Sequence, residues 1–165
     1  KATAQLMRDF GSMMSPQSAF ILNLGLESLH VRMERHCANA LAVAQYLQSH
    51  DKIAWVRYSG LPGDAYYAAA QKYLPQGSCG VVSFGVKGGR QAAETFMKHL
   101  KLGTIATHVA DARTCCLHPA SSTHRQMNDA ELAAAGVGAD LVRLSVGLES
   151  REDLIADLEQ ALAEV

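Results

Sequence analysis

The fold is decided near the C-terminus, by the stretch Leu141-Val142-Arg143-Leu144-Ser145-Val146 and the Gly147-Leu148-Glu149 that follows it. The apolar run predicts a strand, and the glycine after it predicts a turn into the last helix. Side chains of a strand alternate between the two faces of its sheet. Val142, Leu144 and Val146 therefore share one face. Arg143 lies on the other face, together with Leu141 and Ser145.

A guanidinium inside an apolar strand needs an anionic partner, because an unpaired buried charge is costly. Arginine is also the residue that grips a carboxylate with two parallel hydrogen bonds. Arg143 is therefore either a carboxylate-binding residue or one half of a structural ion pair. The sequence of this segment leaves both interpretations open.

Outward from this strand, helices come first in the chain, and then strands alternate with helices. Apolar patterns and turn residues predict strands over residues 53–58, 80–86, 104–109 and 114–118. Helices are predicted over 1–10, from Ser15-Pro16, over 27–49, 65–74 with Asp64 as N-cap, after Gly88-Gly89, over 128–136 and from Ser150. We expect an α/β fold of two layers (α+β), in which helices cover one face of a small, largely antiparallel sheet.

The long helix shows how its faces should divide. A period close to that of a helix predicts a buried apolar stripe of Leu29, Met33, Cys37, Ala40, Leu41, Ala44 and Leu47. Glu34, Arg35, Asn39 and Gln45 fall on the side that should be wetter. The other face of the sheet, which carries Arg143, should then meet solvent, a partner or another domain.

Composition restricts the class of protein. The 165 residues fit one compact domain, and the formal net charge of −1 offers no basic surface for nucleic acid. No apolar run approaches the ~20 residues of a membrane span. The four cysteines do not form a secreted disulfide pattern, which favours a reduced, cytoplasmic protein. The chain begins at Lys1 without an initiator methionine or a signal peptide, and we expect it to be part of a longer polypeptide.

Histidines and cysteines gather between residues 108 and 124. Cys115 and Cys116 are adjacent and would point to opposite faces of a strand, which disfavours a shared zinc ion. We expect these cysteines to fill the core and His118 to be a structural, hydrogen-bonded histidine. A Ser-His-Asp hydrolase is also disfavoured, because no G-x-S-x-G turn exposes a serine.

Two sets of motifs resemble the cystathionine gamma-synthase-like family of enzymes of cysteine and methionine metabolism, which depend on pyridoxal phosphate. The C-terminal set is the run from His118-Pro119-Ala120-Ser121-Ser122-Thr123-His124 to Val142-Arg143-Leu144-Ser145-Val146-Gly147-Leu148-Glu149. The N-terminal set is similar to the O-acetylhomoserine sulfhydrylase branch. It comprises Arg8-Asp9-Phe10-Gly11, Ser15-Pro16, Ala19-Phe20, Gly25-Leu26-Glu27-Ser28-Leu29 and Arg32-Met33-Glu34-Arg35-His36.

The resemblance implies a fold-type I enzyme, commonly a homotetramer, in which a lysine of a preceding domain holds pyridoxal 5'-phosphate. None of the chain's lysines lies in such a motif, so we expect no catalytic residue here and no cofactor bound to this chain alone. Residues 1–50 would be interdomain helices and residues 51–165 the C-terminal substrate-binding domain, with the N-terminal cofactor domain as a partner.

The resemblance also implies roles for single residues. Arg143 matches the arginine that holds the substrate α-carboxylate, and Thr123 matches a threonine near the same group. His108 stands where relatives carry serine or asparagine, and Asp111 matches an acidic position of structural role. The implied reaction of the intact enzyme converts O-acetyl-L-homoserine and sulfide to homocysteine.

Other functions remain open at this stage. Within the family these are a methionine gamma-lyase and a cystathionine gamma-synthase or gamma-lyase. Outside it, the chain could be a standalone assembly module without enzymatic activity.

Overall fold

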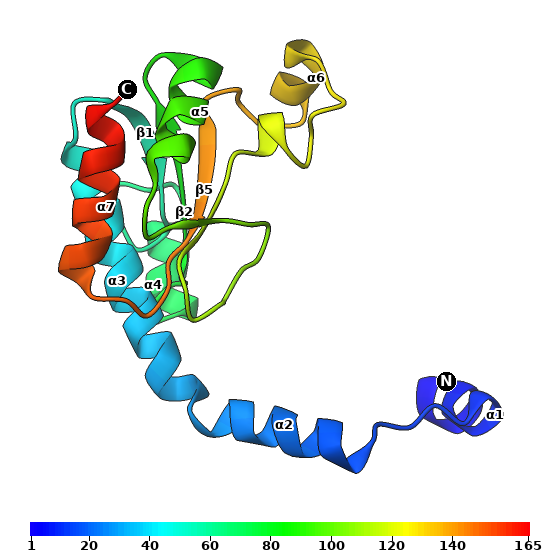
Figure 1. Cartoon of the computed structure of the whole chain (residues 1–165). Coiled ribbons are helices and arrows are strands. Elements are labelled where there is room, and N and C mark those ends of the chain that lie inside the picture. The colour runs from blue at the N-terminus through cyan, green and yellow to red at the C-terminus, as the bar shows by residue number, and fades with distance from the viewer. The chain divides into compact units, whose positions relative to one another are not determined.

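A computed structural model describes residues 1–165, and these divide into two compact units, 1–32 and 33–165. The first unit begins with a π-helical segment, η1 (Ala2–Met7), which runs into the short α1 (Arg8–Phe10) (Figure 1). Gly11, with φ of 65°, ends this stretch in the left-handed region that favours glycine. The helix predicted over residues 1–10 is thus helical, but it is wound as a π-helix over most of its length.

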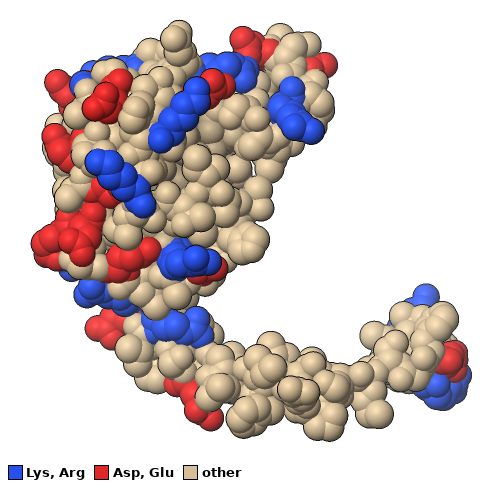
Figure 2. Space-filling view, in the orientation of Figure 1, with Lys and Arg blue, Asp and Glu red and all other residues tan.

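Helix α2 (Pro16–Glu27) starts as its sequence predicts. Ser15 is the N-cap and its side chain accepts a hydrogen bond from Ser18 N, while Pro16 takes the first helical position. No residue of the first unit is buried. Residues 10–26 carry no acidic or basic side chain, and Figure 2 shows this stretch without charge.

The second unit holds the sheet. Helix α3 (Leu29–Ser49) leads into it from the first unit. The remaining elements are β1 (Ile53–Arg57), α4 (Tyr67–Tyr73), β2 (Val81–Val86), α5 (Gly89–His99), β3 (Thr104–Ile105), β4 (Cys115–Leu117), η2 (Pro119–Ser121), α6 (Asp129–Ala134), β5 (Leu141–Ser145) and α7 (Arg151–Ala163).

The five strands form one sheet in the order β1-β2-β5-β4-β3. Every pairing is antiparallel except β3 with β4, which is parallel, so the expectation of a largely antiparallel sheet is confirmed. Strand β3 is shorter than predicted and ends at Ile105. Strand β5 lies in the middle of the sheet, with Arg143 opposite Ser83 of β2 and opposite Leu117 of β4.

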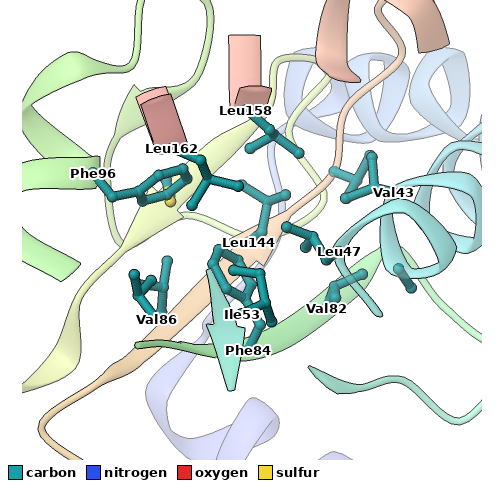
Figure 3. Packing of buried hydrophobic residues seen from close by; sticks show 14 of the residues in the cluster. Val43, Leu47, Ile53, Val82, Phe84, Val86, Phe96, Leu144, Leu158 and Leu162 are labelled. Atoms are coloured by element: carbon teal, nitrogen blue, oxygen red, sulfur yellow. The ribbon is translucent and has the colours of Figure 1, made fainter. Parts of the chain in front are cut away.

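Helices α3, α5 and α7 contribute apolar side chains to a core on one face of the sheet (Figure 3). Phe84 and Phe96 are fully buried and meet edge to face, with ring centroids 5.7 Å apart. The inward side chains of β2 and β5 are buried as their alternation predicts. They are Val82, Phe84, Val86, Val142 and Leu144, and Val146, the residue after β5, is buried as well. The two-layer α/β architecture is therefore confirmed.

The predicted faces of the long helix need correction. Leu29 and Met33 are 38% and 37% exposed, whereas Asn39, placed on the wetter side, is fully buried. Its Nδ2 donates to the carbonyls of Gly147 and Glu149, each at 3.0 Å. These backbone acceptors pull a polar side chain into the interior, which apolar periodicity cannot reveal.

The N-cap predicted for the helix after residue 64 is also wrong. Tyr66 is the N-cap of α4 and makes no capping bond through its side chain. The Asp64 carboxylate instead accepts from Tyr66 N at 2.9 Å and from Tyr58 N at 3.3 Å. It therefore orders the turn that precedes the helix. By contrast, the capping box from Asn128 to Glu131 and the Ser150 cap form as predicted.

Candidate functional site

Arg143 lies on the face of β5 opposite the helices. Its Nη2 donates to the carbonyl of Thr107 at 2.8 Å, and it takes part in no ion pair. Its Nε is buried and has no hydrogen-bond partner. A structural ion pair would require a carboxylate of this chain beside the guanidinium, and none is bonded to it. The geometry therefore does not support the structural ion pair.

The segment between β3 and β4 runs along β5 and along the turn that comes after β5. Main-chain atoms of this segment make hydrogen bonds to β5 and to that turn at three points. The Thr107 carbonyl accepts from Arg143 at 2.8 Å. The Ala110 N–H donates to Ser145 Oγ at 3.1 Å. The Ala112 carbonyl accepts from Leu148 N at 2.8 Å. We call residues 107–112 the covering loop, because it lies against the outer face of β5.

A carboxylate closes the far end of the covering loop. Glu149 accepts from Thr114 N at 2.6 Å through Oε1 and from Thr114 Oγ1 at 2.9 Å through Oε2. Gly147 N in turn donates to Thr114 Oγ1 at 2.8 Å. A Cβ on Gly147 would stand 2.5 Å from Thr114 N and 2.6 Å from the Ala112 carbonyl oxygen, so only glycine fits here.

Of the three predicted substrate-binding residues, Arg143 is hydrogen-bonded to the residue before His108, and Thr123 is bonded to neither Arg143 nor His108. His108 follows Thr107 directly, and its side chain is exposed without a hydrogen bond. Thr123 comes shortly after η2, and its hydroxyl shares a 2.9 Å hydrogen bond with His124 Nδ1. It makes no hydrogen bond to Arg143 or His108.

The Asp111 carboxylate makes a local contact within its own turn. Its Oδ1 accepts from Arg113 N at 2.9 Å, and this bond lowers the pKa of the carboxyl. The positive charges that Arg113 and His108 can carry lower this pKa further. A negative Asp111 beside His108 therefore adds an acidic group at the exposed edge of the covering loop.

Cys115 and Cys116 are buried and His118 is hydrogen-bonded, as predicted. Cys115 and Cys116 are buried in β4, and burial raises the pKa of both thiols. Both ring nitrogens of His118 lie 2.8 Å from a partner, Nδ1 from Ser121 Oγ and Nε2 from the Ala139 carbonyl. No group of three or more His, Cys, Asp or Glu residues is arranged to hold a metal ion.

The lysines of this chain do not fit the covalent attachment of an aldehyde cofactor, because none is buried. Lys52 Nζ donates to the carbonyls of Leu162 and Ala163 at the end of α7. Lys72 lies over the ring of Tyr73. None of the helices has both the length and the apolar character that crossing a bilayer requires.

Sequence reasoning missed the main-chain partners of the site. The Thr107 carbonyl and the Ala110 N–H carry no residue-type signal, because every residue of the covering loop has such groups. Glu149 stands in the quoted motif, but its bonds join residues 35 positions apart and could not be read from spacing.

Comparison with known proteins places these features in a family. The model of the Cys/Met metabolism PLP-dependent enzymes matches residues 1–163. The chain is 46% identical to O-acetyl-L-homoserine sulfhydrylase of Leptospira meyeri and 45% identical to O-acetyl-L-homoserine sulfhydrylase 1 of Thermus thermophilus. These matches cover 100% and 99% of this chain, but only 38% and 39% of the relatives. The chain thus spans well under half the length of these relatives.

A solved structure agrees with the sequence matches. The Campylobacter jejuni protein described as an O-acetylhomoserine (thiol)-lyase superposes with a TM-score of 0.88 at 39% identity. It covers 98% of this chain, which corresponds to 38% of that protein, and it carries N'-pyridoxyl-lysine-5'-monophosphate. With its motifs, its sheet and nearly its whole length matched, the chain belongs to the family of Cys/Met metabolism PLP-dependent enzymes.

Proposed function

We propose that the chain is the C-terminal domain of an O-acetylhomoserine sulfhydrylase, in which it binds and orients the amino-acid substrate. The intact enzyme would convert O-acetyl-L-homoserine and sulfide to homocysteine, in the cytoplasm and as a homo-oligomer. The identity of 45–46% to two enzymes of that name supports this function. The single observation that carries the role of the domain is the unpaired guanidinium of Arg143 on the outer face of the sheet.

Arg143 would hold the substrate α-carboxylate. Its Nη2 already donates to the Thr107 carbonyl, which fixes the orientation of the guanidinium plane. A carboxylate accepting from Nη1 and from the free N–H of Nη2 would gain two charge-assisted hydrogen bonds, because the buried Nε is out of its reach. Fixing this end of the substrate restricts the direction of its reacting bonds, which is an effect of positioning. His108 and Thr123 would line the same site as hydrogen-bond donors.

The exposed first unit supports a partner domain. Phe20, Ile21 and Leu24 of α2 are 65%, 59% and 55% exposed, although they are large and apolar. A surface of this kind marks a protein contact. We assign residues 1–50 to the connection with an N-terminal cofactor domain and residues 51–165 to the substrate-binding domain. That preceding domain would supply the lysine that holds pyridoxal phosphate.

The test is steady-state kinetics of Arg143→Ala in the full-length protein. Losing a charge-assisted contact of ~1.5–3 kcal/mol should raise the KM for O-acetylhomoserine by about 10- to 150-fold. Arg143→Lys should recover only part of this, because an ammonium lacks the planar fork. Arg151→Ala is the matched control, since Arg151 is exposed at the start of α7 on the helix layer.

An unchanged KM in Arg143→Ala would remove the assigned role. Product analysis tests the reaction itself. Homocysteine formed from O-acetylhomoserine and sulfide supports the proposal. Turnover of methionine or cystathionine, without that synthesis, would assign the protein to a gamma-lyase or a cystathionine synthase instead.

A further inference from the structure

Ser145 lies two residues beyond Arg143, on the same face of β5, and is only 2% exposed. A buried hydroxyl is expected to have a partner. Its Oγ accepts from the main-chain N–H of Ala110 in the covering loop at 3.1 Å. The two outward-facing polar residues of β5 therefore each hold one point of the same loop.

The backbone at the Ser145 contact is unusual. Ala110 has φ of +61° and is the only residue other than glycine with a positive φ. This conformation is costly for a residue with a Cβ, and it persists only where the surroundings enforce it. The hydrogen bond from Ala110 N to Ser145 Oγ is one contact that can enforce it. The bonds of Leu148 and Glu149 fasten the loop further along.

The position of the loop matters for Arg143, because the Thr107 carbonyl is the only hydrogen-bond partner of the guanidinium. Thr107 is three residues from Ala110, and His108 lies between them. Releasing the loop at Ala110 would free the Thr107 carbonyl to shift, and the guanidinium would lose the contact that orients it.

We infer that Ser145 is a positioning residue that sets the guanidinium of Arg143 and the place of His108 by holding the covering loop through the Ala110 N–H. This inference rests on the proposed function of Arg143. Ser145 touches neither the substrate nor the reacting atoms in this account, and acts through Arg143.

The experiment compares Ser145→Ala with Ser145→Thr in the full-length enzyme. Ser145→Ala should raise the KM for O-acetylhomoserine by about 3- to 10-fold, as expected for one neutral hydrogen bond, with kcat within about twofold. The KM for sulfide should not change. Ser145→Thr keeps the hydroxyl and should restore most of the binding. Ser83→Ala is the control, because Ser83 faces Arg143 from β2 without a bond to the loop.

A double-mutant cycle separates positioning from a general loss of structure. If Ser145 acts through Arg143, Ser145→Ala should add almost nothing to the KM of Arg143→Ala. Additive effects would overturn the inference, as would a wild-type KM in Ser145→Ala. A lower kcat together with a higher KM for sulfide would assign Ser145 a structural role. A lower thermal stability with unchanged kinetics would do the same.

Two further readouts keep the test decisive. If Ser145→Ala does not fold, Ser145→Thr and Ser145→Val form a pair of equal shape that differs only in the hydroxyl. A Val variant with the KM of the Thr variant would refute the inference. If Arg143→Ala itself leaves KM unchanged, the proposed function fails. If Arg143→Ala raises KM and none of the Ser145 variants does, only this inference fails.

Discussion

Residues 1–32 and residues 33–165 are both rich in apolar side chains, but they use them differently. The second unit buries 26 apolar residues around a sheet, and the first unit buries none. Yet both units have a helix with a serine N-cap, which is Ser15 in α2 and Ser150 in α7. Local signals therefore suffice to define where a helix starts. They do not decide whether its apolar residues find a partner, because most helical stability comes from tertiary packing.

The largest effect on stability is expected when one phenylalanine is replaced in each unit of the 165-residue chain. Phe84→Ala should lower the free energy of unfolding by about 3–5 kcal/mol, because Phe84 is fully buried against Phe96. Phe20→Ala should change it little, because Phe20 is 65% exposed. Urea titration followed by the fluorescence of Trp55, the chain's single tryptophan, measures the second unit directly. Comparable losses in both variants would show that the first unit also packs.

A second pair of substitutions compares carboxylates. Asp157 is 8% exposed and accepts from the N–H groups of Lys101, Leu102 and Gly103. Asp157→Ala should cost about 2–3 kcal/mol, since it leaves these donors without their charged partner. Asp9 pairs only with its exposed neighbour Arg8, and Asp9→Ala should have no measurable effect. The same urea titration distinguishes them, and equal effects would contradict the contrast.

Alkaline pH should weaken only the second unit, because residues 1–32 contain no cysteine or tyrosine. Burial raises the pKa of the Cys116 thiol above its ordinary value of 9.0. The folded chain therefore keeps a proton that the unfolded chain releases. Stability is full below pH 9 and falls as the pH rises above it, by about 1.4 kcal/mol at pH 10 for this thiol.

Urea titrations at pH 8 and pH 10 measure this loss. Cys116→Val keeps an apolar group of similar size without a proton, and it should reduce the difference between the two pH values. An equal difference in Cys116→Val would assign the alkaline sensitivity to other groups, such as Tyr58, whose pKa burial also raises.

The smallest effect is expected at the caps. Ser150→Ala should lower the free energy of unfolding by about 1 kcal/mol, because the Asp153 N–H loses its acceptor at the start of a packed helix. Ser15→Ala removes an equivalent bond to Ser18 N from an unpacked helix. It should reduce the far-ultraviolet helical signal and leave the unfolding midpoint of the second unit unchanged. A shift of that midpoint would show that the stabilities of the two units are coupled.

The sequence predicted features that depend on neighbours in the chain. The alternation around Arg143 placed it correctly on the outer face of β5, and the caps at Ser15, Asn128 and Ser150 were correct. Errors arose where distant groups intervene. Asn39 was expected on the solvent-exposed side of its helix, but it donates to carbonyls of residues more than 100 positions later in the sequence.

The candidate site shows the same division. Arg143 was identified from its strand and from the family resemblance. The strand predicted over 104–109 ends at Ile105 instead, and the covering loop begins soon after it. Its fastening points are main-chain atoms of Thr107, Ala110 and Ala112, which no pattern of side chains encodes.

This manner of fastening has a consequence for how the protein can diversify. Because the covering loop is held by its carbonyl and amide groups, the identity of most of its side chains is free to drift without loosening it. His108, exposed and without a hydrogen bond, is one such free position and follows Thr107, whose carbonyl accepts from Arg143. Residue 108 can therefore change while Gly147, where a Cβ would collide with the main chain, keeps the frame constant.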